Sequence, residues 1–243
     1  MANWSDPRAN AAAFAAADAG SRSAARDAGL RSYMLSVYNY MASGVLLTGI
    51  VALAFAASGY AAAVFQTPLK WLIILSPLAF VMVLSFGINK LSEGTAKLLF
   101  WAFATVMGLS MSTIFLVYTG PSIAITFFAT AAAFLSLSLY GYTTKRDLSG
   151  LGTFLIMGVV GLIVASLLNL WFQSPALNLA ISAIGVLLFA GLTAYDTQRI
   201  KEMYDHVAGT DMMGKAVIMG ALSLYLDFVN MFQFLLSFLG SRE

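Results

Sequence analysis

Two aspartates stand out because each lies within or at the edge of a long apolar stretch. Asp196 lies in GLTAYDTQRIKEMY and Asp227 in ALSLYLDFVNMFQFLL, whereas the other charged residues fall between such stretches. A charge in the hydrocarbon of a membrane costs about 2.5–3.5 kcal/mol on insertion scales, so these residues usually face the interior of a helix bundle or a water-filled path. The two aspartates are therefore the leading candidates for a functional site.

Two carboxylates that meet in a low-dielectric interior cannot both ionise at low cost, so they titrate as one unit. When both protons have left, the carboxylates can join oxygens of Ser223, Asn230 or water in a hard oxygen site that suits Ca²⁺. This chemistry predicts competition between protons and calcium, with the direction of pH gating left open. The alternative is that the aspartates only cap helices or anchor hydrogen bonds between helices.

Composition identifies the class of protein that must hold these residues. Hydrophobic residues make up 60% of the 243-residue chain and charged residues only 10%, which predicts a multi-pass, all-α membrane protein built as one unit over residues 34–240. The absence of cysteine excludes disulfides and thiolate chemistry, and a net charge of +2 gives no case for nucleic acid. We expect neither an enzyme nor a cofactor. Residues 1–33 are rich in alanine and serine and are expected to be a disordered cytosolic tail.

Seven apolar stretches are each close to the ~20 residues that a membrane-spanning helix needs. Glycine and proline mark most of their boundaries, as in Gly120-Pro121 and Ser174-Pro175. The predicted spans are 34–58, 71–88, 97–118, 121–142, 151–172, 175–197 and 215–239.

The basic residues predict the orientation of these spans. Every lysine and arginine except Lys70 and Arg242 falls on the side of the amino terminus. Positive residues gather on the cytosolic side of membrane proteins, so we expect a cytosolic amino terminus and a carboxyl terminus on the opposite side.

Helical spacing places further polar residues beside the aspartates. At 100° per residue, Ser223 and Asn230 share a face of the last span with Asp227, and Thr193 aligns with Asp196 on the sixth span. This polar face predicts that the last span lies near the centre of the bundle. Tyr195 and Tyr225 are weaker candidates for the same site. Asp227 lies near the middle of its span and Asp196 near the end of its own, so a tilted helix or a broken turn is needed to match their depths.

The segments GLTAYDTQRIKEMY and ALSLYLDFVNMFQFLLSFLG resemble the two most characteristic segments of the Bax inhibitor-1 family, in its bacterial branch. The entry to the first span, Arg31 to Tyr38, and the patch Gly108 to Ser112 also resemble it, so the similarity covers residues 30–240. The resemblance implies seven helices with the last one wrapped by the other six, and a pair of aspartates that share a proton and gate a calcium leak. Family members often carry a basic latch in the second span that pairs with the first aspartate. The candidate for that latch is Lys90.

The expected function is thus a pH-sensitive calcium leak channel or transporter, with Asp196 and Asp227 as proton sensors and Ca²⁺ ligands. Its expected partners are membrane lipid, calcium and protons, and the resemblance implies a bacterial plasma membrane. The alternative is a regulatory membrane protein that binds a protein partner, such as a membrane protease or a stress or cell-death factor. An intramembrane hydrolase is disfavoured because the chain has one histidine and no GxGD string.

Overall fold

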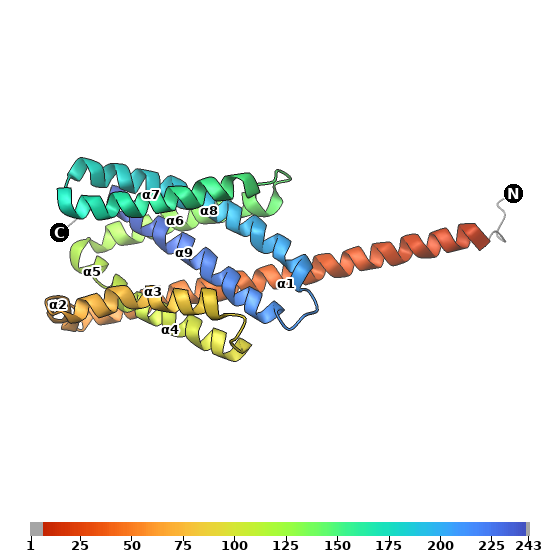
Figure 1. Cartoon of the computed structure of the whole chain (residues 1–243), viewed down its shortest axis with the longest axis horizontal. Helices are drawn as coiled ribbons and strands as arrows, with labels where there is room; N and C mark the ends of the chain where they lie inside the picture. Colours follow the sequence, from red (N-terminus) through yellow and green to blue (C-terminus); the bar gives the residue numbers. More distant parts are fainter. Residues whose placement is uncertain (1–6, 242–243) are drawn as a thin grey trace.

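The computed structural model describes residues 7–241, and it describes side-chain surroundings for Gly20 and residues 23–241. Arg242, one of the two cations expected on the far side, lies outside the described residues. The described chain folds into helices joined by short turns (Figure 1). Their bounds are α1 Pro7–Ala57, α2 Tyr60–Phe65, α3 Leu69–Gly87, α4 Glu93–Met111, α5 Ile114–Val117, α6 Gly120–Thr143, α7 Ser149–Phe172, α8 Pro175–Val207 and α9 Met213–Leu239.

Seven helical segments of the described chain are long and apolar enough to cross a membrane. This confirms the predicted all-α architecture with seven spans. The third span, 93–117, consists of α4 and α5, which are separated by a break at Ser112 and Thr113. The short helix α2 lies in the connection between the first and second spans.

Helix α1 begins at Pro7, so residues 7–33 are helical and continuous with the first span. A disordered tail was expected there. Alanine has the highest helix propensity of all residues, and adding residues to a helix that already exists avoids the cost of nucleation. In Figure 1 this part of α1 extends well beyond the bundle towards the amino terminus.

Helix α8 is also longer than predicted, because it continues to Val207 and not to 197. Contacts with α1 hold the extra turns. Tyr204 is buried against Tyr33, with ring centroids 5.6 Å apart. Arg26 donates two hydrogen bonds, of 2.8 and 2.6 Å, to the carboxylate of Asp205. These contacts join α1 and α8 at the end of the bundle where most of the lysines and arginines lie, which we call the basic end.

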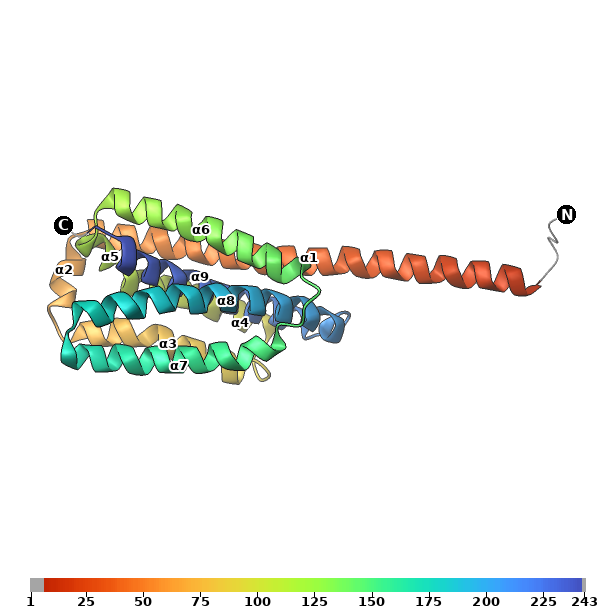
Figure 2. The same ribbon diagram turned by 90° about the horizontal axis from the view of Figure 1, so that it is seen from above.

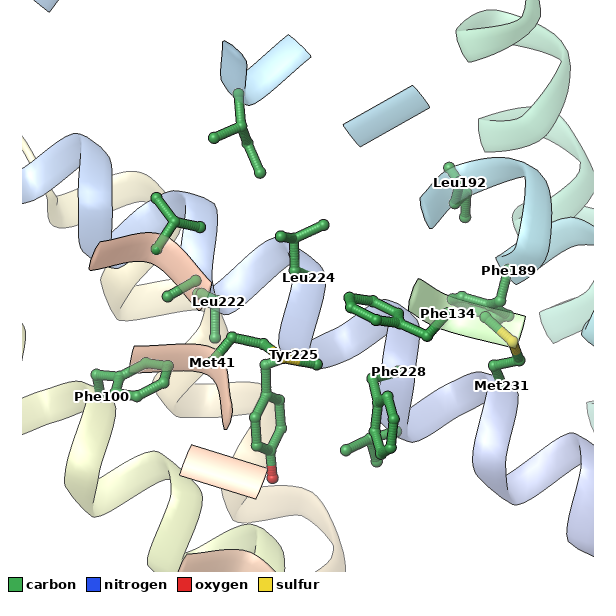
Figure 3. Close-up of a cluster of buried hydrophobic side chains, with 14 of the residues drawn as sticks. Met41, Phe100, Phe134, Phe189, Leu192, Leu222, Leu224, Tyr225, Phe228 and Met231 are labelled. Atoms are coloured by element: carbon green, nitrogen blue, oxygen red, sulfur yellow. The ribbon is translucent and has the colours of Figure 1, made fainter. Parts of the chain in front are cut away.

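Helix α9 is the most buried of the seven spans and crosses the middle of the bundle in both views (Figures 1 and 2). It packs against α8, α1, α6 and α4. Figure 3 shows part of the resulting core, in which Phe134 of α6 contacts Phe228 of α9 edge to face, with ring centroids 5.5 Å apart. The enclosure of α9 by all six other spans stays a prediction.

Close helix approaches depend on two small residues. A Cβ at Gly141 of α6 would lie 2.2 Å from the carbonyl oxygen of Ala194 on α8. A Cβ at Gly108 of α4 would lie 2.7 Å from the carbonyl oxygen of Thr48 on α1. Small residues let membrane helices approach closely, so Gly141 permits the approach of α6 to α8 and Gly108 permits that of α4 to α1.

Candidate functional site: a pair of aspartates in a chain of cavities

A cavity of about 610 Å³, which we call the middle cavity, contains both aspartates in its lining. It reaches the outer surface of the bundle between α3 and α7, where Leu78 and Val160 of its lining are exposed. In Figure 1 two of the helices that line it, α3 and α7, lie on either side of α9. The wall is mostly apolar, as expected at membrane depth. Its lining residues are Pro77, Leu78, Val81, Phe103, Met107, Ile156, Val159, Val160, Ile163, Phe189, Leu192, Tyr195, Asp196, Arg199, Ser223, Leu226, Asp227 and Asn230.

A second cavity, of about 440 Å³, lies between the end of α3, the last turns of α8 and the first turns of α9. We call it the basic-end cavity, because Lys215 and Arg199 line it. Asp196, Arg199 and Ser223 line both this cavity and the middle one. The two cavities therefore meet at these three side chains.

A third cavity, of about 330 Å³, lies towards the other end of α9 and includes Gln233. It shares no lining residue with the middle cavity. The three cavities follow one another along α9, at residues 212–223, 223–230 and 233–236. They also follow α3 in the reverse order, from Ser85 and Ile88 through Pro77 to Ile74.

Asp227 is buried in the core of the membrane domain. Its side chain is only 4% exposed, and its Oδ2 atom has no hydrogen-bond partner among the described residues. A buried polar atom without a partner is costly, so it is retained where it has a role or where a proton, water or ion satisfies it. The structure thus places an unsatisfied carboxyl oxygen on a residue that lines the middle cavity.

Asp196 is half-buried and lies on the adjacent helix α8. Asp196 and Asp227 both line the middle cavity, which is the observation that brings them together. Helix α8 continues for about three turns beyond Asp196, so Asp196 does not lie at the end of its helix, where the predicted end of the sixth span at 197 would have put it.

The predicted supporting residues divide into two groups. Ser223, Asn230 and Tyr195 line the middle cavity with the aspartates. The side-chain N–H of Asn230 donates a hydrogen bond to the carbonyl of Leu226 at 2.8 Å. Its amide oxygen is the atom that can accept a hydrogen bond or bind a cation.

The other two predicted residues, Thr193 and Tyr225, are fully buried and lie outside this lining. The hydroxyl of Thr193 donates a hydrogen bond to the carbonyl of Phe189 within its own helix. The hydroxyl of Tyr225 pairs with that of Thr48 on α1 at 2.6 Å. The structure does not place them in the cavity with the aspartates. Tyr225 lies about 160° from Asp227 around α9 and faces α1, and Thr193 lies about 60° from Asp196 and is fully buried.

Lys90 does not reach the aspartates in the structure. It is exposed in the turn after α3 and is not in the lining of either cavity that contains Asp196. The cation near Asp196 is instead Arg199, which lies one turn later on α8 and acts on that carboxyl electrostatically. Sequence reasoning missed Arg199, although residues three apart on a helix are neighbours and this spacing was legible. The signal was hidden because the sixth span was expected to end at 197.

The other face of the same segment fastens α8 to its neighbours. Gln198 accepts a hydrogen bond from the Leu148 backbone and donates one to the Arg146 carbonyl, both at 2.8 Å. Lys201 donates to the Tyr142 carbonyl at 2.8 Å. The string Tyr195-Asp196-Thr197-Gln198 therefore has two roles, with one face towards the cavities and the other towards the α6–α7 connection.

The oxygen atoms around the middle cavity could supply part of the coordination shell of a hard cation. The described residues contain no group of three or more acidic, histidine or cysteine side chains that could hold a metal. Two carboxylates that each bind through one oxygen, with the neutral oxygens of Ser223 and Asn230, supply only some of the six to eight oxygens that Ca²⁺ takes, and water would complete the shell. The arrangement fits a passing ion better than a structural one.

A family model described as "Inhibitor of apoptosis-promoting Bax1" matches residues 30–243 of the chain. The inner membrane protein YbhL of Escherichia coli K12 is 48% identical over 220 residues, covering 89% of this chain and 94% of YbhL. An uncharacterized protein of Rickettsia prowazekii is 47% identical over 219 residues, covering 89% of this chain and 92% of the relative. An uncharacterized protein of Borreliella burgdorferi is 40% identical over 214 residues, with coverages of 87% and 92%.

Proposed function

Because this chain belongs to the Bax inhibitor-1 family of membrane proteins, we propose that it is a pH-sensitive calcium leak channel or transporter. In this proposal Asp196 and Asp227 act together as the proton sensor and as ligands of the passing ion. The observation that carries the proposal is the meeting of the basic-end and middle cavities at Asp196, with the unpartnered carboxyl oxygen of Asp227 on a residue of the same lining.

The chemistry of the pair supports a link between protons and calcium. A proton shared by two carboxyl groups neutralises part of the charge that would attract a divalent cation. Loss of that proton exposes two anionic groups with the neutral oxygens of Ser223 and Asn230 close by. Hard oxygen ligands of this kind suit Ca²⁺, so proton binding and calcium binding compete for one site.

The chain of cavities supports a path along α9 that is closed in this conformation. The first two cavities are contiguous, whereas the third shares no lining residue with the middle cavity. The separation falls between Asn230 and Gln233 on α9. In the proposal a rearrangement at this level opens the path to the far side.

The proposal also includes a location and an orientation. The similarity to an inner membrane protein of E. coli supports the bacterial inner membrane. The collection of lysines and arginines at one end supports a cytosolic position for that end, and hence for the amino terminus. The two contiguous cavities then open from the cytosolic side.

The test is Ca²⁺ flux into dye-loaded proteoliposomes between about pH 5 and pH 8, a range that includes neutral pH. We expect flux with a pH dependence that Asp196→Asn or Asp227→Asn abolishes. Asp147→Asn is the matched control, because Asp147 is exposed in the α6–α7 connection and lines none of the three cavities. A wild-type protein that leaks no faster than empty vesicles at any pH contradicts the proposal. The regulatory alternative, in which the protein binds a partner, then becomes the leading one and is pursued by co-purification.

A further inference from the structure

A separate apolar chamber lies on the other side of α9. It has a volume of about 340 Å³ and is bounded by α1, the α4–α5 break, α6 and α9. Phe228, Val229 and Phe232 of α9 form part of its wall, and all three are buried. Asp227 and Asn230 line the middle cavity and not this chamber. Helix α9 therefore has one side with acidic and polar residues and one apolar side.

The chamber is continuous with the surface that faces lipid. Gly49 of α1 and Phe128 of α6 both line it, and both are exposed. Each residue lies about two turns, or roughly 12 Å, from the end of its helix at the side opposite the basic end. The hydrocarbon layer is about 30 Å thick, so this mouth opens at the depth of the acyl chains.

The lining contains no polar group that could hold water. Thr48 is the only polar side chain in it, and its hydroxyl is already bonded to the Ala104 carbonyl at 2.8 Å and the Tyr225 hydroxyl at 2.6 Å. A buried water needs two to four polar partners, and the side chains of this wall offer only the Thr48 hydroxyl, which is already bonded. The chemistry of the wall matches a hydrocarbon chain.

We propose that the chamber binds one acyl chain of a membrane lipid, which enters between Gly49 and Phe128 and reaches the buried wall of α9. An ordinary lipid at the protein surface would contact only the exposed residues of α1 and α6. Contact with Phe228, Val229 or Phe232 distinguishes a bound chain from such a lipid. The proposal does not depend on ion transport.

Gly49 provides a way to block the chamber without disturbing the protein around it. A Cβ at this position has no heavy atom within 4 Å, so Gly49→Leu introduces a side chain at the mouth without a clash at its Cβ. Gly161→Leu on α7 is the matched control, since Gly161 is equally open and exposed but lies outside the chamber. Ala124→Leu blocks the mouth from α6 and serves as a second, independent variant.

The experiment uses the full chain in phosphatidylcholine vesicles that contain a phosphatidylcholine with a diazirine in one acyl chain. After photolysis, the adducts are mapped by mass spectrometry. We expect adducts on Phe228, Val229 or Phe232 of α9 in the wild type and in Gly161→Leu, and their loss in Gly49→Leu and Ala124→Leu. Adducts on the exposed face of α3, which includes Leu72 and Leu75 and carries none of the substitutions, should persist in all four proteins, which shows that each variant is folded and inserted. The proposal is overturned if the wild type gives no α9 adduct, or if the α9 adduct survives in a folded blocking variant.

Discussion

Arg199 follows Asp196 by one helical turn on α8, and both side chains line the two cavities that meet within the bundle. The described structure contains no ion pair between them within 4 Å, and Arg199 is exposed while Asp196 is half-buried. Because Arg199 forms no close ion pair with Asp196, the Asp196 carboxyl stays available to bind a proton or a cation. The charge of Arg199 also opposes the approach of another cation.

Removal of that positive charge should therefore increase calcium entry. We expect Arg199→Gln to raise Ca²⁺ flux at fixed pH by about fivefold, the factor that corresponds to ~1 kcal/mol of electrostatic barrier. The measurement is initial flux in proteoliposomes at equal protein content. Lys201→Gln is the charge-matched control, because Lys201 bonds the Tyr142 carbonyl and lines neither cavity. An equal effect of both substitutions would show that only the net charge of the surface matters.

Tyr225 should matter for stability but not for transport. Its hydroxyl is bonded to Thr48 and lies outside the cavities that contain the aspartates. We expect Tyr225→Phe to lower the free energy of unfolding by about 0.6–1.7 kcal/mol, the range for hydrogen bonds between membrane helices. A double-mutant cycle with Thr48→Val measures the coupling energy between the two hydroxyls. Flux and its pH profile should match those of the wild type. A shifted pH profile would show that Tyr225 takes part in the site after all.

Gln198 should be a structural residue despite its place beside Asp196. Its amide satisfies the Leu148 N–H and the Arg146 carbonyl, and its side chain is only 7% exposed. Gln198→Leu leaves those backbone groups without partners, so we expect a loss of about 1–3 kcal/mol in unfolding experiments in detergent. Gln66→Leu at an exposed helix end is the control and should change stability little. An unchanged melting temperature for Gln198→Leu would mean that water replaces the amide.

The approach of α6 to α8 should fail if Gly141 gains a side chain. Its Cβ would lie 2.2 Å from the carbonyl oxygen of Ala194, which is backbone and cannot move aside alone. We expect Gly141→Ala to cost about 1–3 kcal/mol of stability, as for overpacked cores. Gly150→Ala, where nothing lies within 4 Å, should be neutral or stabilising. Thermal unfolding of both variants checks this difference, and similar melting temperatures would contradict the close approach.

The sequence by itself determined that the chain is a membrane bundle and which residues to examine. Seven long apolar stretches can satisfy their backbone in hydrocarbon only as helices, so composition and length were sufficient for the architecture. Asp196 and Asp227 could also be identified from the sequence, because a charged residue within a long apolar stretch is costly in hydrocarbon and can be recognised without a structure.

Only the tertiary structure decided which side chains share a cavity. The candidate latch Lys90 and the true neighbour Arg199 are both cations near the ends of spans, and the difference between them depends on how far α8 continues. Its last turns are polar and are held by Tyr33 and Arg26 of α1, contacts between residues far apart in the chain. Helical spacing separates Ser223, at about 40° from Asp227, from Tyr225, at about 160°, but it could not show what lies against each of these faces, because a helix inside a bundle has neighbours on every side. The packing of those neighbours determines which side chains face a cavity and which face another helix.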